Sequence, residues 1–168
     1  MIIAVAGIAF AIGDNKLDLD SLEGGPVPQK VNYAAPSLML FDLSGKPVSI
    51  ESSLGKVILI NNWATWCPPC RAEMPDFEKY FQAHKADGFD IIGVNAGDEP
   101  ELVEEFVSRY GLTFPIWLDP DGLSTHAFRN NALPSSYVID RSGTVRLVWI
   151  GEVSVDALET YVTPLLSE

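Results

Sequence analysis

The chain has 168 residues, of which 23 are acidic and 11 basic, so its formal net charge at pH 7 is -12. This length supports one domain with a hydrophobic core, and the negative charge repels phosphate backbones and anionic lipid headgroups. Nucleic acid is therefore excluded as an expected partner. The only two cysteines are Cys67 and Cys70, so the chain has no framework of structural disulfides, and its stability must come from the core.

Residues 2–12 form an uninterrupted run of apolar residues and glycine. A membrane-spanning helix needs roughly 20 such residues, whereas the apolar region of an export signal needs about 7 to 15. We therefore interpret residues 1–13 as an apolar leader or a truncated membrane anchor, with a buried N-terminal element as the alternative. Residues 14–32 contain glycines and prolines without sustained periodicity, which predicts a linker, and the folded domain is expected over residues 33–168.

Apolar runs, helical periodicity and turn residues predict the elements of that domain in order. Residues 38–41 and 47–51 flank the turn at 44–46 and predict a β-hairpin at a sheet edge. The elements expected after it are a buried strand at 57–60, a helix at 71–86, a buried strand at 89–94, a helix at 99–110, a strand at 114–118, a short helix at 123–128, a hairpin of strands at 136–140 and 144–150, and a closing helix at 154–166. This order indicates an α/β fold with a mixed central sheet flanked by helices and an N-terminal β-hairpin extension.

The second helix has a periodic apolar face, which is typical of an amphipathic helix at the surface of a domain. Its members are Leu102, Val103, Phe106, Val107 and Tyr110.

The two cysteines form a Cys-Pro-Pro-Cys motif at positions 67–70. Such a pair serves as a redox couple, as half of a metal site, as a haem attachment site or as a static bridge. Haem attachment needs a histidine at position 71, which is Arg71, and a structural zinc site needs four ligands where the chain adds only two histidines. A bridge over so short a loop constrains the unfolded chain little. The surroundings of the motif therefore favour a redox couple.

The position of the motif supports this interpretation, because it lies where a buried strand ends and a helix begins. The positive end of that helix favours a thiolate at Cys67, which makes it the attacking sulfur. Cys70 lies one turn later and can attack Cys67 once a mixed disulfide has formed. Pro68 and Pro69 lack amide hydrogens for the thiolate, so we expect a moderately lowered pKa at Cys67 and a comparatively reducing couple.

The segment 57–75, VILINNWATWCPPCRAEMP, resembles the active-site segment of thioredoxin-like thiol/disulfide oxidoreductases, closest to the extracytoplasmic TlpA and ResA group. The similarity extends over residues 33–166 and includes Ala35-Pro36, Gly55-Lys56 and the segment 133–140. It implies a thioredoxin fold and an enzyme that exchanges disulfides. No cofactor is expected beyond the redox-active cysteine pair.

The resemblance also implies roles for residues outside the motif. Pro134 is the expected cis proline beside the disulfide, and it places the backbone of Leu133 where a client strand can pair with it. Glu73, three residues after Cys70, is expected to take or give the proton that thiol exchange requires. Trp66 is expected to offer a flat apolar contact for the client, next to the prolines of the motif.

The predicted function is that of an extracytoplasmic disulfide reductase for protein clients, as in cytochrome c maturation, re-reduced by a membrane or soluble partner. An N-terminal membrane anchor is part of this prediction. A peroxiredoxin-like peroxidase is one alternative, although it needs a distant resolving cysteine that the sequence lacks. A Cu(I) metallochaperone is the other, because two close thiolates suit Cu(I).

Overall fold

A computed structural model describes residues 27–168. The leader predicted at 1–13 and most of the predicted linker lie outside the described residues. The strands are β1 (Gln29–Ala34), β2 (Met39–Asp42), β3 (Pro47–Ser49), β4 (Val57–Trp63), β5 (Phe89–Asn95), β6 (Ile116–Leu118), β7 (Ser135–Ile139) and β8 (Thr144–Ile150). The helices are α1 (Pro68–His84), α2 (Pro100–Tyr110), α3 (Leu123–Ala127) and α4 (Val155–Tyr161), and short 3-10 turns lie at Ile50–Ser53, Lys85–Asp87 and Thr163–Ser167.

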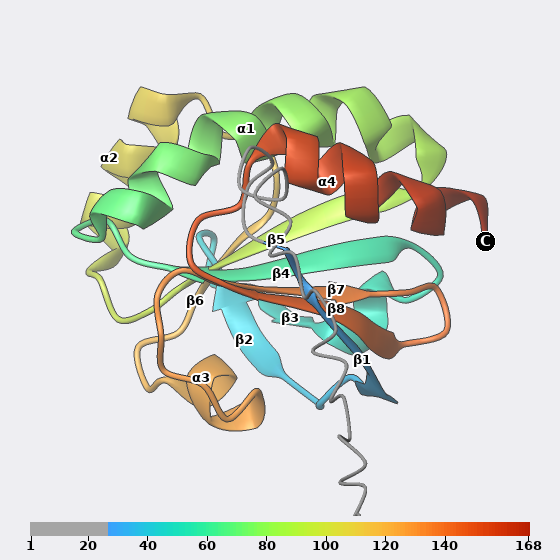
Figure 1. Ribbon diagram of the computed structural model, residues 1–168. Helices are drawn as coiled ribbons and strands as arrows, with labels where there is room; N and C mark the ends of the chain where they lie inside the picture. Colours follow the sequence, from blue (N-terminus) through green and yellow to red (C-terminus); the bar gives the residue numbers. More distant parts are fainter. Residues whose placement is uncertain (1–26) are drawn as a thin grey trace, which may run out of the picture.

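The eight strands form one mixed sheet in the order β1-β8-β7-β4-β5-β6-β2-β3. Strands β4, β5 and β6 run parallel to one another, and every other neighbouring pair is antiparallel. The predicted hairpin is β2–β3, and it adds to the edge beside β6 (Figure 1). The molecule therefore has the predicted thioredoxin fold with a hairpin extension.

Helices α1, α2 and α4 cover one face of the sheet, and α3 lies on the other (Figure 1). Strand β4 contributes to both cores because its side chains alternate between the faces. Leu59 and Trp63 pack in the cluster beneath the three helices, whereas Ile58 and Ile60 pack in the opposite cluster. All seven residues of β4 are buried, as expected for a central strand covered on both sides.

The folded domain begins earlier than the sequence predicted. Strand β1 starts at Gln29 and pairs with β8, where Gln29 lies opposite Val148. The prediction of a linker was therefore wrong for residues 29–32. The strand escaped notice because it lies at the edge of the sheet, where five of its six residues are exposed and no apolar alternation is needed.

Three other predictions changed in detail. Helix α1 begins at Pro68 rather than at residue 71, because proline suits the first helical positions, where no amide donor is needed. Helix α4 ends at Tyr161, and the chain continues as a 3-10 turn that contains Pro164. Leu102, which the helical periodicity assigns to the apolar face of α2, is 52% exposed.

The close approach of β5 to its neighbours requires glycine at position 93. A Cβ atom on Gly93 would lie 2.8 Å from Cδ1 of Ile116 and 3.1 Å from Nε1 of Trp63. We expect Gly93→Ala to lower the free energy of unfolding by about 1–3 kcal/mol, because extra volume in a filled core forces side chains to shift. Urea unfolding measures this change. The exposed Ala83→Ser serves as the control, and equal stability of the two variants would contradict the prediction.

Candidate functional site

Cys67 and Cys70 form a disulfide at the junction between β4 and α1, with Cα atoms 5.3 Å apart. The two sulfur-bearing side chains differ in access, because Cys67 is 3% exposed and Cys70 is fully buried. The adjacent Trp66 is 67% exposed. An incoming molecule therefore reaches Cys67 first, beside a large apolar surface.

Cys67 occupies the N-cap position of α1, with Pro68 and Pro69 at the first helical positions. The backbone N–H of Cys70 donates to Sγ of Cys67 at 3.4 Å. Because the two prolines have no N–H, this is the one first-turn amide that reaches the sulfur. The sulfur thus lies at the positive end of the helix dipole, with a single amide donor.

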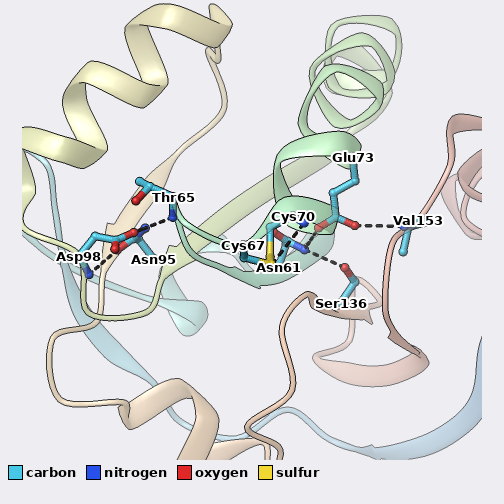
Figure 2. The surroundings of a disulfide bond; sticks show 9 residues. All are labelled: Asn61, Thr65, Cys67, Cys70, Glu73, Asn95, Asp98, Ser136 and Val153. Atoms are coloured by element: carbon cyan, nitrogen blue, oxygen red, sulfur yellow. Dashed lines mark hydrogen bonds between the residues drawn. A yellow bond between two sulfur atoms is a disulfide. The ribbon is translucent and has the colours of Figure 1, made fainter.

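Glu73 is buried one turn after Cys70, with 1% of its surface exposed. Asn61 Nδ2 donates to its Oε1 at 2.8 Å, and the backbone N–H of Val153 donates to its Oε2 at 3.0 Å (Figure 2). Burial raises the pKa of Glu73 to about 8, because removal from water disfavours the charged form. The two hydrogen bonds act against this shift, and the negative charge of Glu152 adds to it. Glu73 can therefore gain or lose a proton near neutral pH.

Asn61 connects this carboxyl group to strand β7. Its Nδ2 also donates to Oγ of Ser136 at 3.0 Å, and its Oδ1 has no hydrogen-bond partner within residues 27–168. The sequence analysis assigned no role to Asn61. The signal that it missed was an asparagine at the end of an otherwise apolar strand, where a buried amide needs a polar partner.

The peptide bond between Leu133 and Pro134 is cis, in agreement with the family resemblance. Pro134 directly precedes β7, whose Ser135 lies opposite Asn62 of β4. The cis proline is therefore at the same end of the sheet as the cysteines. The carbonyl of Pro134 accepts from the N–H of Gly151 at 2.9 Å, which holds this loop against the segment that follows β8.

A partly buried polar network holds the loop that carries Trp66. The carboxylate oxygen Oδ2 of Asp98 accepts from the backbone N–H of Thr65 at 2.7 Å and from Nδ2 of Asn95 at 2.9 Å. Oδ1 of Asn95 in turn accepts from the backbone N–H of Asp98 at 3.0 Å (Figure 2). The end of β5 is thereby fastened to the segment before Cys67. Sequence analysis did not identify Asp98, because it accepts from a backbone amide more than 30 residues earlier in the chain, nor Asn95, whose partner is Asp98.

Neither a metal site nor a membrane-spanning helix is found in the part of the chain that the structure describes. Residues 27–168 contain no group of three or more histidine, cysteine, aspartate or glutamate side chains arranged to hold a metal ion. No helix among these residues is long and apolar enough to cross a membrane.

The sequence and the fold of this chain match known proteins. The model of the AhpC/TSA family matches residues 31–148. The chain belongs to this family. A relative from Geobacillus kaustophilus, named thiol-disulfide oxidoreductase ResA, is 34% identical over 132 residues, which are 79% of this chain and 76% of that protein. A relative of the same name from Oceanobacillus iheyensis is 30% identical over 169 residues, covering 98% of this chain and 85% of that one.

A solved structure agrees with these relatives. The thiol:disulfide interchange protein of the thioredoxin family from Chlorobium tepidum superposes with a TM-score of 0.73 at 30% identity, covering 82% of this chain and 99% of that chain. The chain is therefore a thioredoxin-like disulfide oxidoreductase within its family, as the sequence predicted.

The buried Glu73 makes stability depend on pH. Its folded-state pKa lies above the usual 4.5, so the stability that neutral Glu73 contributes is present below pH 4.5 and lost as pH rises through about 8. Between pH 5 and 9, we expect the oxidised wild type to lose roughly 4 kcal/mol of unfolding free energy relative to Glu73→Gln. Urea unfolding at both pH values tests this. The exposed control Glu101→Gln should follow the wild type, and parallel curves for wild type and Glu73→Gln would contradict the expectation.

The network around Asp98 makes a separate prediction. Replacing Asp98 with alanine leaves the N–H of Thr65 and Nδ2 of Asn95 without their acceptor. We expect this variant to lose about 1.5–3 kcal/mol of stability, the usual range for hydrogen bonds to a charged group. The variant Asp98→Asn keeps an acceptor oxygen and should lose less. Denaturant unfolding of the oxidised proteins measures both changes, and an alanine variant as stable as the asparagine variant would refute the role of the network.

Proposed function

We propose that the protein is an extracytoplasmic disulfide reductase for protein clients, with Cys67 as the nucleophile and Cys70 as the resolving thiol. The observation that carries the proposal is a pair of bonded cysteines at the start of α1, in which Cys67 is 3% exposed and follows the exposed Trp66, whereas Cys70 is fully buried. Such a pair can form an intermolecular bond at one sulfur and complete the exchange with the other.

The exchange begins with the reduced protein. The Cys67 thiolate attacks one sulfur of a client disulfide, so that a mixed disulfide forms and the other client sulfur leaves as a thiolate. Cys70 then loses its proton and attacks Sγ of Cys67, which releases the second client thiolate and forms the Cys67–Cys70 disulfide. Two electrons pass to the client in each cycle. The sulfurs supply the whole redox chemistry without a further cofactor.

Glu73 is proposed to receive the proton of Cys70 and to return it in the reverse step. It lies three residues after Cys70 on the same helix, and its pKa of about 8 is suited to proton exchange near neutral pH. Asn61 and the backbone of Val153 hold the carboxyl group in place through both oxygens.

Client binding is proposed at the loop before β7. The backbone of Leu133 forms no hydrogen bond within the described part of the chain, so its N–H and C=O are free to pair with an extended client segment. The cis bond to Pro134 sets the direction of this backbone. Trp66 and the prolines at 68 and 69 supply apolar contact on the other side of the disulfide.

The compartment and partners follow from the same proposal. An exchange pair that reduces clients must be re-reduced after each cycle, so a membrane-bound or soluble partner supplies two electrons. The apolar run at residues 2–12 supports export, with anchoring at the outer face of the cytoplasmic membrane. Relatives named ResA and interchange proteins support a role in maintaining protein thiols, as in cytochrome c maturation.

Reduction of insulin by dithiothreitol tests the two cysteines separately. We expect the wild type to accelerate the reaction, Cys67→Ser to have no activity, and Cys70→Ser to stall as a mixed disulfide that mass spectrometry detects. Equilibration with glutathione then gives the reduction potential. A value near or below roughly -250 mV agrees with a reductase, and one near roughly -120 mV indicates an oxidase instead.

Two outcomes would replace the proposal with its alternatives. Rapid consumption of hydrogen peroxide by the reduced protein, without insulin reduction, would indicate a peroxidase. Stoichiometric Cu(I) binding that glutathione cannot reverse, again without insulin reduction, would indicate a metallochaperone.

A further inference from the structure

A small pocket adjoins the cysteine motif on the side of α2. It has a volume of about 160 Å³ and lies between the start of α1 and one face of α2. Thr65, two residues before Cys67, and Arg71, directly after Cys70, form its border with the motif. An extended chain advances about 3.3–3.6 Å per residue. A client held at Cys67 therefore brings the residues next to its own cysteine to this pocket.

Arg71 is the cation of the pocket that has no carboxylate partner. Its Nε donates to the hydroxyl of Tyr110 at 3.3 Å, and within residues 27–168 it forms no ion pair. The other arginine of the pocket, Arg109, is paired with Glu105. A guanidinium group has five N–H donors, so most of the donors of Arg71 are left for a ligand.

The charged residues that line the pocket are Arg71, Arg109 and Glu105. Glu105 pairs with Arg109, so the charge of Arg71 is left over and the lining is positive, although the whole chain carries a net charge of -12. A positive site on an acidic protein attracts an acidic group locally.

The part of the pocket wall that α2 forms contains apolar side chains, and ring contacts hold Phe106 in position. The ring of Phe106 stacks on Tyr110 with centroids 4.2 Å apart and contacts Trp63 at 4.8 Å. Leu102, which is 52% exposed, borders the same space. This wall suits the methylene groups of an acidic side chain whose carboxylate meets Arg71. It also explains why an apolar residue of α2 faces solvent.

We propose that this pocket binds an aspartate or glutamate side chain adjacent to the client's reactive cysteine, and that Arg71 is the residue that selects it. The inference rests on the proposed disulfide exchange and names a class of clients for it. Acidic residues elsewhere in the client should give less advantage, because the chain as a whole is acidic.

Symmetrical disulfide dimers of the peptide acetyl-Gly-X-Cys-X-Gly-amide test the selection, with X as Glu, Gln or Lys. The reduced wild-type protein is mixed with each dimer, and the released peptide thiol is measured by chromatography after acid quenching. Glutamate beside a cysteine also changes the intrinsic reactivity of the peptide disulfide. The quantity compared is therefore the Glu-to-Gln rate ratio of the wild type divided by the same ratio for Arg71→Gln.

We expect this quotient to be about three to five, the size of one partly exposed ion pair, and to fall toward one in high salt. Arg71→Lys should keep part of the preference, because it retains the charge but not the forked donors. Arg129→Gln removes a cation outside the pocket and should show the wild-type ratio. For the Lys dimers, we expect the Lys-to-Gln rate ratio to be lower for the wild type than for Arg71→Gln.

A quotient of one at low salt overturns the pocket assignment, while exchange with all three dimers leaves the proposed function intact. The assignment is also overturned if Arg129→Gln lowers the Glu-to-Gln rate ratio as much as Arg71→Gln does, because the effect would then come from overall charge. Absence of exchange with every dimer would overturn both the proposed function and this inference.

Discussion

The central position of strand β4 is the constraint on which the site depends. All seven of its residues are buried, and it pairs with β5 on one side and β7 on the other. Because of the register of these strands, the C-terminal ends of β4 and β5 and the start of β7 lie at the same end of the sheet. The cysteine motif follows β4, Asp98 follows β5, and Pro134 precedes β7. One buried strand thus brings together three segments that are distant in the sequence.

The polar groups beneath α1 are buried without a neutralising cation. Burial raises the pKa of Glu73 to about 8, and the hydrogen bonds that it accepts from Asn61 and Val153 offset only part of this rise. Asn61 contributes a donor to Glu73 while its own Oδ1 has no partner. A buried acceptor without a donor costs about 1–3 kcal/mol, so this polar cluster lowers the stability of the fold. Selection for packing alone would place apolar side chains here.

The surface around the disulfide has different properties on its two sides. In the proposed function, the backbone of Leu133 offers hydrogen bonds toward β7 that any extended chain can form. In the further proposal, Arg71 and the ring of Phe106 offer charge and shape toward α2, and binding there depends on the client sequence. The first contact would serve any disulfide substrate, and the second would distinguish one substrate from another.

Much of the fold was predictable because its signals are local. The apolar run at 57–60, the turn at 44–46 and the helical periodicity at 99–110 each depend on neighbouring residues, and each corresponds to an observed element. Strand β1 was not predictable from its own residues, because an exposed edge strand needs no apolar pattern and is defined by its partner β8. The exposure of Leu102 was not predictable for a related reason, since periodicity cannot reveal that part of the apolar face of α2 borders an open pocket.

The sequence by itself determined the chemistry of this protein, because two cysteines separated by two prolines at a strand-to-helix junction have few uses besides disulfide exchange. It also identified the family, the cis proline and Glu73 as a candidate. Only the tertiary structure decided that Glu73 is buried between Asn61 and Val153, that Asp98 holds the loop before Cys67, and that Arg71 faces a pocket on α2. These properties depend on burial and on contacts between segments 30 to 80 residues apart, which no local pattern of residue types encodes.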